Sequence, residues 1–517
     1  MTTTQDAPAE AGDLKTWTYE RAVFATIAAL VLVRLIVAAN MPLAGDEALY
    51  WRYSRYLAPG YLDHPAMNPF FIRLGTMLFG DTAFGVRLFA VLTALPATWA
   101  IWRSGAVISG QERIGATAAL FFNLTITMGV GSMLATSDAS VVMTSCFVLL
   151  ALAKLNQTDR GIWWLAVGLT LGVGMWAKYT TAFFAFGIAL WLLMVPDKRK
   201  WFFSPWPYLG AIAALLVFAP VLMWNANHEW ASVAYQSSRF ITHQFKIAYP
   251  LELLVSQIGL ATPSIFILAV LGVLWSYREP QFRSTSVLFA SLVLPVLGYF
   301  LWHSLHERVQ GNWPECITPA LVCAAAMAVH LQESQQGSGA ATARWSNRLA
   351  VPVALLLVTL VYAQAIFGLI PLRRDPTSRL LGGGWPELAQ SIDLMRERVG
   401  AQVLLTTDYT LASALTYYLP SHAPAEQMND RVRWANEPPP PQALFAQQML
   451  YVCKEPCRYA SQLGNRFADV ERLGAAPRMR RGVVVERYSV YRVRGQVRPT
   501  LDPMYPIRTK ASDEYVL

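Results

Sequence analysis

Charge is scarce in this sequence. Only 15% of the 517 residues are Asp, Glu, Lys or Arg, whereas a soluble protein of average composition carries about 25%. Apolar and aromatic residues are not scarce, because 54% of the chain is hydrophobic and it contains 18 Trp, 21 Tyr and 24 Phe. This composition excludes a disordered chain and argues against a set of ordinary soluble domains. It indicates an integral membrane protein.

Cysteine is also rare, with five residues, and their spacing gives no framework for a metal. Three lie in apolar stretches, whereas Cys453 and Cys457 form a C-x3-C pattern in a polar one. A disulfide between them is expected if that region is exported, and two free thiols are the alternative. The net charge of +9 would suggest nucleic-acid binding in a soluble protein. In a membrane protein it indicates basic cytoplasmic loops instead, so no nucleic-acid partner is expected.

Long apolar runs dominate the chain up to residue 371. A membrane-spanning helix needs about 20 mostly apolar residues. Eleven candidate spans are predicted at 22–40, 86–102, 114–133, 139–153, 162–177, 181–196, 206–224, 253–277, 286–302, 314–332 and 349–371. The polar residues 1–21 form an N-terminal tail, and the first apolar run lacks a small-residue cleavage site, which indicates an uncleaved span. Residues 66–80 are apolar but short and amphipathic, and they predict a helix at the membrane surface.

Basic residues orient these spans. With the N-terminal tail in the cytoplasm, the inner segments hold 13 Lys and Arg in 73 residues, against 7 in 93 residues of the outer segments. Such a bias marks the cytoplasmic side. An odd number of spans then places everything after residue 371 outside.

The tail, residues 372–517, has a different pattern. Its periodicity predicts an amphipathic helix at 385–399, a strand at 402–406, a helix at 409–418, and strands at 448–453 and 483–494. We therefore expect a small α/β domain on the outer face of the membrane, separate from the membrane domain of residues 22–371.

Polar residues with reactive side chains gather on the predicted outer side. The first outer loop, residues 41–85, begins Gly45-Asp46-Glu47-Ala48-Leu49-Tyr50-Trp51 and also contains Asp63-His64-Pro65; later outer segments carry Asp138, Lys178, His303, His306, Glu307, Arg308 and Asn312. Each has an ordinary explanation as well: an Asp can cap a helix, and a Lys can extend toward the headgroups. His303, His306 and Glu307 match no strong metal motif, although a weak metal site there stays open. Ionisable residues at a membrane edge are costly, so their gathering on one side predicts a functional site.

Carboxylates together with Lys, Arg and His at this edge suit group transfer from a lipid-phosphate donor. A carboxylate can take the proton of an acceptor hydroxyl, and fixed cations can stabilise the departing phosphate. A transporter or flippase is an alternative of a different class, although transporters place ionisable groups near the bilayer midplane. A structural protein of envelope assembly is a further alternative, against which the clustered carboxylates argue.

These motifs resemble the GT-C glycosyltransferases, in particular the bacterial branch of the protein O-mannosyltransferase family. That branch includes lipid A aminoarabinose transferases and lipopolysaccharide galacturonosyltransferases. The resemblance covers roughly residues 20–330, and it is carried by Asp46–Trp51, Leu62–Pro65, Phe79–Asp81, Ala177–Thr180 and Gln310–Pro314. It implies a mainly α GT-C membrane fold, with about eleven spans and the small α/β domain, in a bacterial inner membrane with the site and the tail in the periplasm.

The activity that the resemblance implies is an inverting transfer of one sugar from a polyprenyl-phosphate donor to an envelope acceptor, lipid A or the lipopolysaccharide core. The sugar could be a hexosyl, uronosyl or aminopentosyl group, and a protein O-mannosyltransferase is the alternative within the class. Membrane lipids are the other expected partners. No cofactor is required, a divalent metal stays open, and a monomer is expected.

The resemblance also implies roles for individual residues. Asp46 matches the general base of the family, with Glu47 beside it, and Asp138 matches the acidic residue that positions the acceptor or the base. The remaining candidates are Lys178, Arg308 and His64 for the donor phosphate, and Asp63, Tyr50, His306 and Asn312 for the acceptor. Asp63-His64-Pro65 departs from the acidic residue, Lys and Pro of the aminoarabinose transferases. Because the charge of His64 would depend on pH near 6.5, this departure argues against aminoarabinose as the sugar.

Overall fold

The computed structural model describes residues 9–238, 245–370, 372, 375, 377–378 and 381–505. The chain forms two compact units. The first comprises Met1–Ala39, His64–Leu222 and Ser237–Tyr362, and the second comprises Asn40–Asp63, Met223–Gln236 and Ala363–Leu517. The chain therefore passes from the second unit into the first between Asp63 and its neighbour His64.

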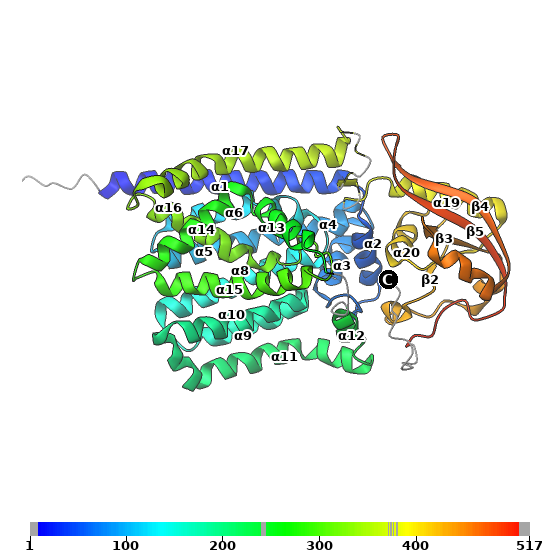
Figure 1. Cartoon of the computed structure of the whole chain (residues 1–517), viewed down its shortest axis with the longest axis horizontal. Coiled ribbons are helices and arrows are strands. Elements are labelled where there is room, and N and C mark those ends of the chain that lie inside the picture. The colour runs from blue at the N-terminus through cyan, green and yellow to red at the C-terminus, as the bar shows by residue number, and fades with distance from the viewer. Residues whose placement is uncertain are drawn as a thin grey trace, which may run out of the picture. The chain divides into compact units, whose positions relative to one another are not determined.

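Helices make up the first unit (Figure 1). Those that lie in it wholly or for most of their length are α1 Ala9–Asn40, α3 Met67–Phe79, α4 Ala83–Leu92, α5 Ala94–Ser109, α6 Glu112–Leu124, α7 Ile126–Gly129, α8 Ser137–Thr158, α9 Trp163–Ala177, α10 Phe183–Met194, α11 Pro205–Asn227, α13 Ala248–Leu260, α14 Pro263–Arg278, α15 Arg283–Ser304, α16 Thr318–Leu331 and α17 Gly337–Phe367. Short 3-10 helices accompany them at Gly131–Met133, Tyr179–Ala182, Pro196–Phe203 and Glu315–Ile317.

The eleven predicted apolar segments all fall on these helices. Among the described residues, six helices are long and apolar enough to cross a membrane, or nine if each of three bent helix pairs is one span. Two shorter apolar helices, Trp163–Ala177 and Glu315–Leu331, coincide with the two remaining segments. The mainly α membrane fold is confirmed, whereas the number of eleven crossings stays a prediction. The segment 66–80 is helical as α3, and its place at the membrane surface also stays a prediction.

Two predicted spans are bent rather than straight. Segment 253–277 consists of α13 and α14, which meet at an angle of 96°. The break falls at Thr262, whose φ of 66° is left-handed, just before Pro263, and a residue before proline is disfavoured in the helical conformation. Segment 114–133 bends by 64° after Leu124, where the Thr125 hydroxyl accepts the Met128 N–H at 3.2 Å and starts a new helix.

Small residues let helices of the first unit approach closely. Gly168 of α9 faces Gly210 of α11, and a methyl group at Gly168 would lie 1.9 Å from the carbonyl oxygen of Gly210. Such contacts between small residues are a common way to pack helices in membranes, where burial of apolar surface does not drive association.

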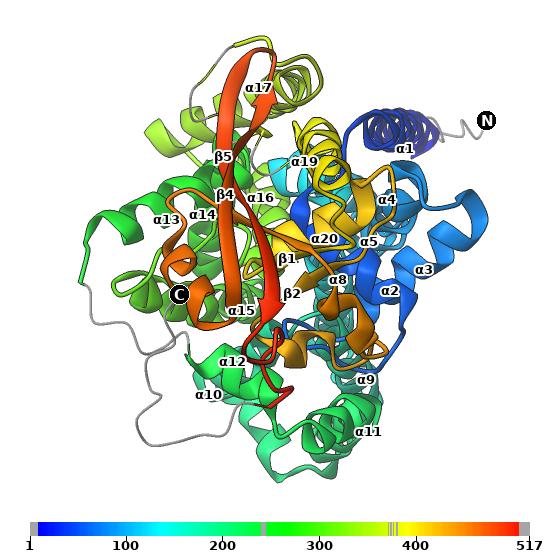
Figure 2. The same cartoon turned by 90° about the vertical axis from the view of Figure 1, so that its right-hand side faces the viewer.

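A five-stranded sheet forms the centre of the second unit (Figure 2). The strands are β1 Val403–Thr406, β2 Ala425–Gln427, β3 Met449–Lys454, β4 Phe467–Arg480 and β5 Val483–Gln496. Their order is β2-β1-β3-β5-β4; β1 is parallel to β2 and β3, whereas β5 is antiparallel to β3 and β4. The other elements of this unit are α2 Gly45–Arg55, α12 Ala231–Ser238, α19 Trp385–Val399, α20 Tyr409–Tyr418 and the 3-10 helices Arg431–Trp434, Gln442–Ala446 and Arg458–Asn465.

The sheet is covered on both faces. Leu404 and Leu450 pack with apolar residues of α19 and α20, whereas Val403, Leu405 and Met449 pack into a second apolar cluster on the opposite face. This alternation follows from the period of two along a strand. The predicted elements at 385–399, 402–406, 409–418, 448–453 and 483–494 are all confirmed. The prediction missed β2, which has three residues, and β4, whose charged residues, Gly and Pro obscure the pattern of a strand.

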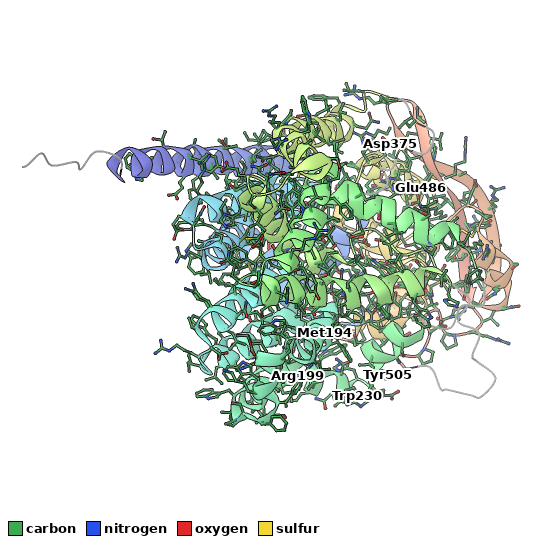
Figure 3. All side chains as sticks on the ribbon, turned by 60° about the vertical axis from the view of Figure 1, so that its left-hand side comes forward. Met194, Arg199, Trp230, Asp375, Glu486 and Tyr505 are labelled. Carbon is green, nitrogen blue, oxygen red and sulfur yellow. A yellow bond between two sulfur atoms is a disulfide. The ribbon has the colours of Figure 1, made fainter. Side chains whose placement is uncertain are left out.

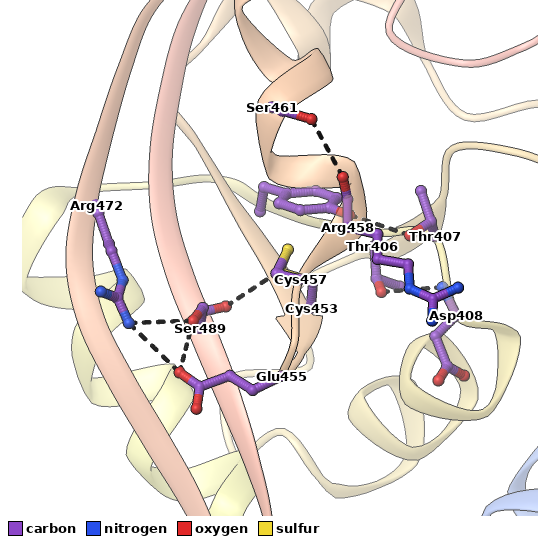
Figure 4. The surroundings of a disulfide bond; sticks show 11 residues. Thr406, Thr407, Asp408, Cys453, Glu455, Cys457, Arg458, Ser461, Arg472 and Ser489 are labelled. Carbon is purple, nitrogen blue, oxygen red and sulfur yellow. Dashed lines mark hydrogen bonds and ion pairs between the residues drawn. A yellow bond between two sulfur atoms is a disulfide. The ribbon is translucent and has the colours of Figure 1, made fainter.

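Cys453 and Cys457 form a disulfide (Figure 4), so of the two alternatives the structure has the bonded one. Cys453 lies near the end of β3, and its sulfur atom is 3.8 Å from the carbonyl oxygen of Ser489 on β5. The Ser489 hydroxyl in turn donates to Glu455 at 2.8 Å. The disulfide thus closes the short loop that follows β3.

Two arginines on β4, the buried Arg478 and the partly buried Arg480, bind residues that follow α17. The Arg478 guanidinium pairs with Glu486 at 2.8 Å and donates to the Gly383 carbonyl at 2.8 Å. Arg480 donates to the Ser378 hydroxyl at 3.1 Å, and Ser378 donates to Asp375 at 2.7 Å; Asp375 and Glu486 are labelled in Figure 3. These bonds tie Asp375, Ser378 and Gly383 to β4 within the second unit.

The start of the predicted first outer loop also belongs to the second unit. Arg52 of α2 makes two hydrogen bonds of 2.8 Å to the Glu437 carboxylate and one of 2.9 Å to the Ala425 carbonyl. The loop 41–85, expected to be one part of the membrane domain, is therefore divided after Asp63. The physical reason for this division is the bidentate pairing of the buried Arg52 with Glu437, which binds the start of the loop to the C-terminal residues.

Candidate functional site

The first polar cluster lies in the first unit and centres on Asp138 and Lys178. Asp138 is in the first turn of α8, and Lys178 follows the last residue of α9. Their side chains form an ion pair of 2.6 Å, although the two residues are only 7% and 6% exposed. The Asn312 amide donates to the other carboxylate oxygen at 2.7 Å. The structure thus brings three predicted site residues together.

Further polar groups surround this pair. The Thr136 hydroxyl donates to Asp138 at 3.1 Å, and His64 and Glu315 lie within electrostatic reach of the Asp138 carboxylate. Glu315 is only 4% exposed, and the sequence prediction missed it. A buried charge is costly unless it is paired. An acidic residue at the start of the apolar segment 314–332 is therefore unusual, and this position was the signal that could have identified Glu315. The cluster offers a fixed cation, Lys178, held by the Asp138 carboxylate.

The second polar cluster lies in the second unit and begins at α2. Glu47 is fully buried, and its carboxylate accepts the Ala44 N–H at 2.8 Å, so it caps its own helix. Its neighbour Asp46 is exposed. Of the two adjacent acids, Asp46 is therefore the one whose position suits a reaction with a substrate.

Asp63 is held firmly in the same unit. It accepts a hydrogen bond of 2.7 Å from the Tyr53 hydroxyl and pairs with the Arg433 guanidinium. Burial raises the pKa of Tyr53, and the nearby Asp63 charge raises it further, so Tyr53 stays a hydrogen-bond donor. Tyr50 is also buried, with its ring 6.2 Å from that of Tyr53. Tyr50 supports this network, and its place as an acceptor-binding residue stays a prediction.

Arg433 and Tyr409 were missed by the sequence prediction. Arg433 is only 2% exposed, and its guanidinium lies 4.1 Å from the ring centre of Tyr409. Burial opposes the Arg433 charge, but Asp63 holds the pKa of the guanidinium above its usual range. The Asp46 charge is the largest cause that raises the pKa of Tyr409, followed by burial. No sequence signal marks either residue, because they lie in a polar domain with many arginines and tyrosines.

The other predicted residues lie apart from these clusters. Arg308 is exposed and pairs with Glu252 at 2.9 Å. His306 is beside the Trp302 carbonyl at 3.3 Å, whereas His303 lies 3.6 Å from Glu307. Among the described residues no group of three or more His, Cys, Asp or Glu could hold a metal ion. The possible metal site at His303, His306 and Glu307 is therefore not supported.

Comparisons with known proteins find relatives of this chain. The family model for dolichyl-phosphate-mannose-protein mannosyltransferase matches residues 63–224. A lipid A galacturonosyltransferase, RgtD of Rhizobium johnstonii, is 26% identical over 72% of this chain and 77% of its own length. The undecaprenyl phosphate-alpha-4-amino-4-deoxy-L-arabinose arabinosyl transferase of Edwardsiella ictaluri is 27% identical over 37% of this chain and 35% of its own.

A solved structure has the same fold. ArnT from Cupriavidus metallidurans, crystallised with undecaprenyl phosphate, superposes with a TM-score of 0.58 at 18% identity, over 93% of this chain and 99% of its own. The protein is thus a membrane glycosyltransferase with the GT-C fold. Its sequence resembles the bacterial branch of the protein O-mannosyltransferase family, as the motifs of the first loop indicated. The transporter and envelope-assembly alternatives are set aside by this finding.

Proposed function

We propose that the protein transfers a single sugar, with inversion, from a polyprenyl-phosphate donor to lipid A or the lipopolysaccharide core. The observation that carries the proposal is the buried Lys178 cation, fixed by Asp138 at 2.6 Å. A preorganised cation suits a phosphate that gains charge as it leaves. The relatives support the two substrates, because one is named a lipid A galacturonosyltransferase and others are named for an undecaprenyl-phosphate sugar.

The proposed reaction assigns one task to each cluster. The acceptor hydroxyl oxygen forms a bond to the anomeric carbon of the sugar, on the face opposite the bond to phosphate, which breaks. The electron pair of that bond remains on the polyprenyl phosphate, where Lys178 stabilises it. Asp46, exposed in the first turn of α2, takes the proton of the hydroxyl as general base.

The neighbouring residues have supporting tasks in this proposal. Asp138 holds Lys178, Asn312 holds Asp138, and His64 adds a hydrogen-bond donor toward the phosphate. Glu47 caps α2 and is not the base. Arg308, which pairs with Glu252, lies outside the proposed phosphate site.

We further propose that both clusters work at the periplasmic side, without a divalent metal, in a monomer. The excess of Lys and Arg in the predicted inner segments supports this orientation. The Cys453–Cys457 disulfide supports it independently, because disulfides form in oxidising compartments. Lys178 provides the positive charge that a metal would otherwise supply to the phosphate.

The proposal is tested with the full chain in lipid nanodiscs. It is incubated with undecaprenyl phosphate linked to galacturonic acid, aminoarabinose or mannose, and with lipid A, lipopolysaccharide core or a peptide as acceptor. Mass spectrometry identifies the products. Transfer to lipid A or the core is the expected result. Transfer to peptide alone would establish the O-mannosyltransferase alternative, after which the matching family model is named. Absence of transfer with every pair would refute the proposed function.

A further inference from the structure

Two polar segments of the second unit follow the carboxyl ends of adjacent parallel strands. Strand β1 ends at Thr406, and Tyr409 begins the helix that follows it. Strand β2 ends at Gln427, and Arg433 lies in the 3-10 helix that comes next. In open α/β sheets ligands bind beyond the carboxyl ends of the parallel strands. Tyr409 and Arg433 therefore occupy the edge of the sheet where such folds place functional groups.

The start of α2 packs directly on the start of α20 at this edge. A methyl group at Gly45 would lie 2.0 Å from Cγ2 of Thr410, so this contact requires a residue without a side chain. Gly45 precedes Asp46, and Thr410 follows Tyr409. The contact places Asp46 and Tyr409 in the same region, and the Asp46 charge, followed by burial, raises the pKa of the Tyr409 hydroxyl.

Arg433 occupies a built polar site in the same place. It is buried, it pairs with Asp63, and its Nε has no hydrogen-bond partner among the described residues. Its guanidinium lies 4.1 Å from the ring centre of Tyr409 and 5.4 Å from that of Tyr235. Tyr235 comes from α12, and the next residue, Gln236, donates to the Asp63 carbonyl at 2.7 Å. Three separate segments thus converge on Asp63 and Arg433.

We propose that Arg433 and Tyr409 of the C-terminal domain are positioning residues for Asp63 and Asp46 of the first loop, and that this group of residues binds the acceptor glycan. The inference rests on the proposed function. Arg433 holds the buried Asp63 carboxylate in an ion pair, whereas Asp46 is exposed. Half-exposed Tyr409 and Tyr235 provide hydroxyls and ring faces for a sugar. The C-terminal domain is then part of the acceptor site, not an accessory to the membrane domain.

The test compares two buried arginines of the same 3-10 helix. Arg433→Gln removes the partner of Asp63, whereas the control Arg431→Gln removes a similarly buried arginine, 6% exposed, that pairs with Glu426 at 3.1 Å. Both variants should lose thermal stability. We expect Arg433→Gln alone to lower kcat/KM for the acceptor by about 10- to 100-fold, the scale for a misplaced reacting group. The KM for the donor should stay unchanged, and Arg433→Lys should recover part of the loss.

A double-mutant cycle tests whether Arg433 acts through Asp63. Asp63→Asn should reproduce the loss in Arg433→Gln, and the double variant should be no worse than the poorer single variant, because coupled residues are not additive. Equal acceptor kcat/KM in Arg433→Gln and Arg431→Gln would overturn the inference, as would independent, multiplicative losses in the cycle. Both results require an active wild type, so they leave the proposed function intact, whereas an inactive wild type refutes the proposed function itself.

Discussion

The ion pair of Lys178 and Asp138 can be either a donor site or a purely structural contact, and its burial allows a decisive test. Lys178→Met removes the cation with little change in side-chain length. Asp138 is only 7% exposed, and breaking a buried pair by removing one partner costs about 3–5 kcal/mol of stability. The loss of one preorganised donor to a transition state costs about 2.7–4 kcal/mol, or 10²- to 10³-fold in kcat. The single variant therefore confounds the two effects.

The double variant Lys178→Met, Asp138→Asn separates them. It leaves no unpaired charge, and replacement of a buried pair by neutral groups of similar size is often close to neutral in stability. We expect its melting temperature to return most of the way to that of the wild type, while kcat stays about 10²-fold low or lower. Purified protein in nanodiscs is assayed for unfolding, for turnover and for binding of undecaprenyl phosphate.

Lys198 provides the matched control. It is 8% exposed and pairs at 3.2 Å with Asp159, which is exposed and also pairs with Lys200. Lys198→Met thus removes a similarly buried lysine that has no place in the proposed reaction. Its turnover, corrected for folded protein, should match the wild type. If the double variant at Lys178 and Asp138 regained turnover along with stability, the pair would be structural and the reasoning on the phosphate would be refuted.

Four further predictions follow from the same structure. Asp46→Asn should abolish transfer while preserving fold and donor binding, whereas Glu47→Gln should chiefly lower the melting temperature because Glu47 caps α2; near-normal turnover of Asp46→Asn would exclude it as the base. A phosphatase reporter fused after residue 371 should be active in the periplasm, and a cytoplasmic signal would mean a miscounted span. EDTA should leave turnover unchanged, and stimulation by added Mg²⁺ or Mn²⁺ would contradict the metal-free proposal. Burial opposes the Asp393 charge, but hydrogen bonds from Arg396 and Ser421 hold the pKa of Asp393 below its usual range. Asp393→Asn should therefore lower Tm at neutral pH, and the difference in Tm should be lost as pH falls through that lowered pKa. A difference in Tm that is independent of pH would show that the Asp393 charge is not involved.

The second unit illustrates how far local pattern reaches. The helix Trp385–Val399 was predicted with its bounds, because an amphipathic repeat begins at a Trp-Pro pair and ends before a glycine. The strand Phe467–Arg480 was not predicted, because it is an edge strand with many charges, and its conformation depends on pairing with β5. Short-range periodicity identifies elements that fold by their own pattern, and it misses elements that exist only through a partner.

The candidate site shows the same division. The sequence pointed to Asp46 and Glu47 as a pair, because both stand at the start of a loop beside a span. Only the folded chain separates them, since Glu47 turns back to the Ala44 N–H while Asp46 is exposed. Arg433 could not be predicted, because its partner Asp63 is 370 residues away in the chain.

By itself, the sequence determined that this is a membrane protein of mainly helical fold with a small α/β domain, and that its reactive residues gather beside the spans. Apolar length, loop charge and local periodicity are all properties of short segments, and they can be recognised without a fold. Tertiary structure alone decided that Asp138 meets both Lys178 and Asn312, and that the start of the first loop, as far as Asp63, packs with the C-terminal domain. Those pairings join residues 40, 174 and 370 positions apart, and only the packing of whole elements brings such residues together.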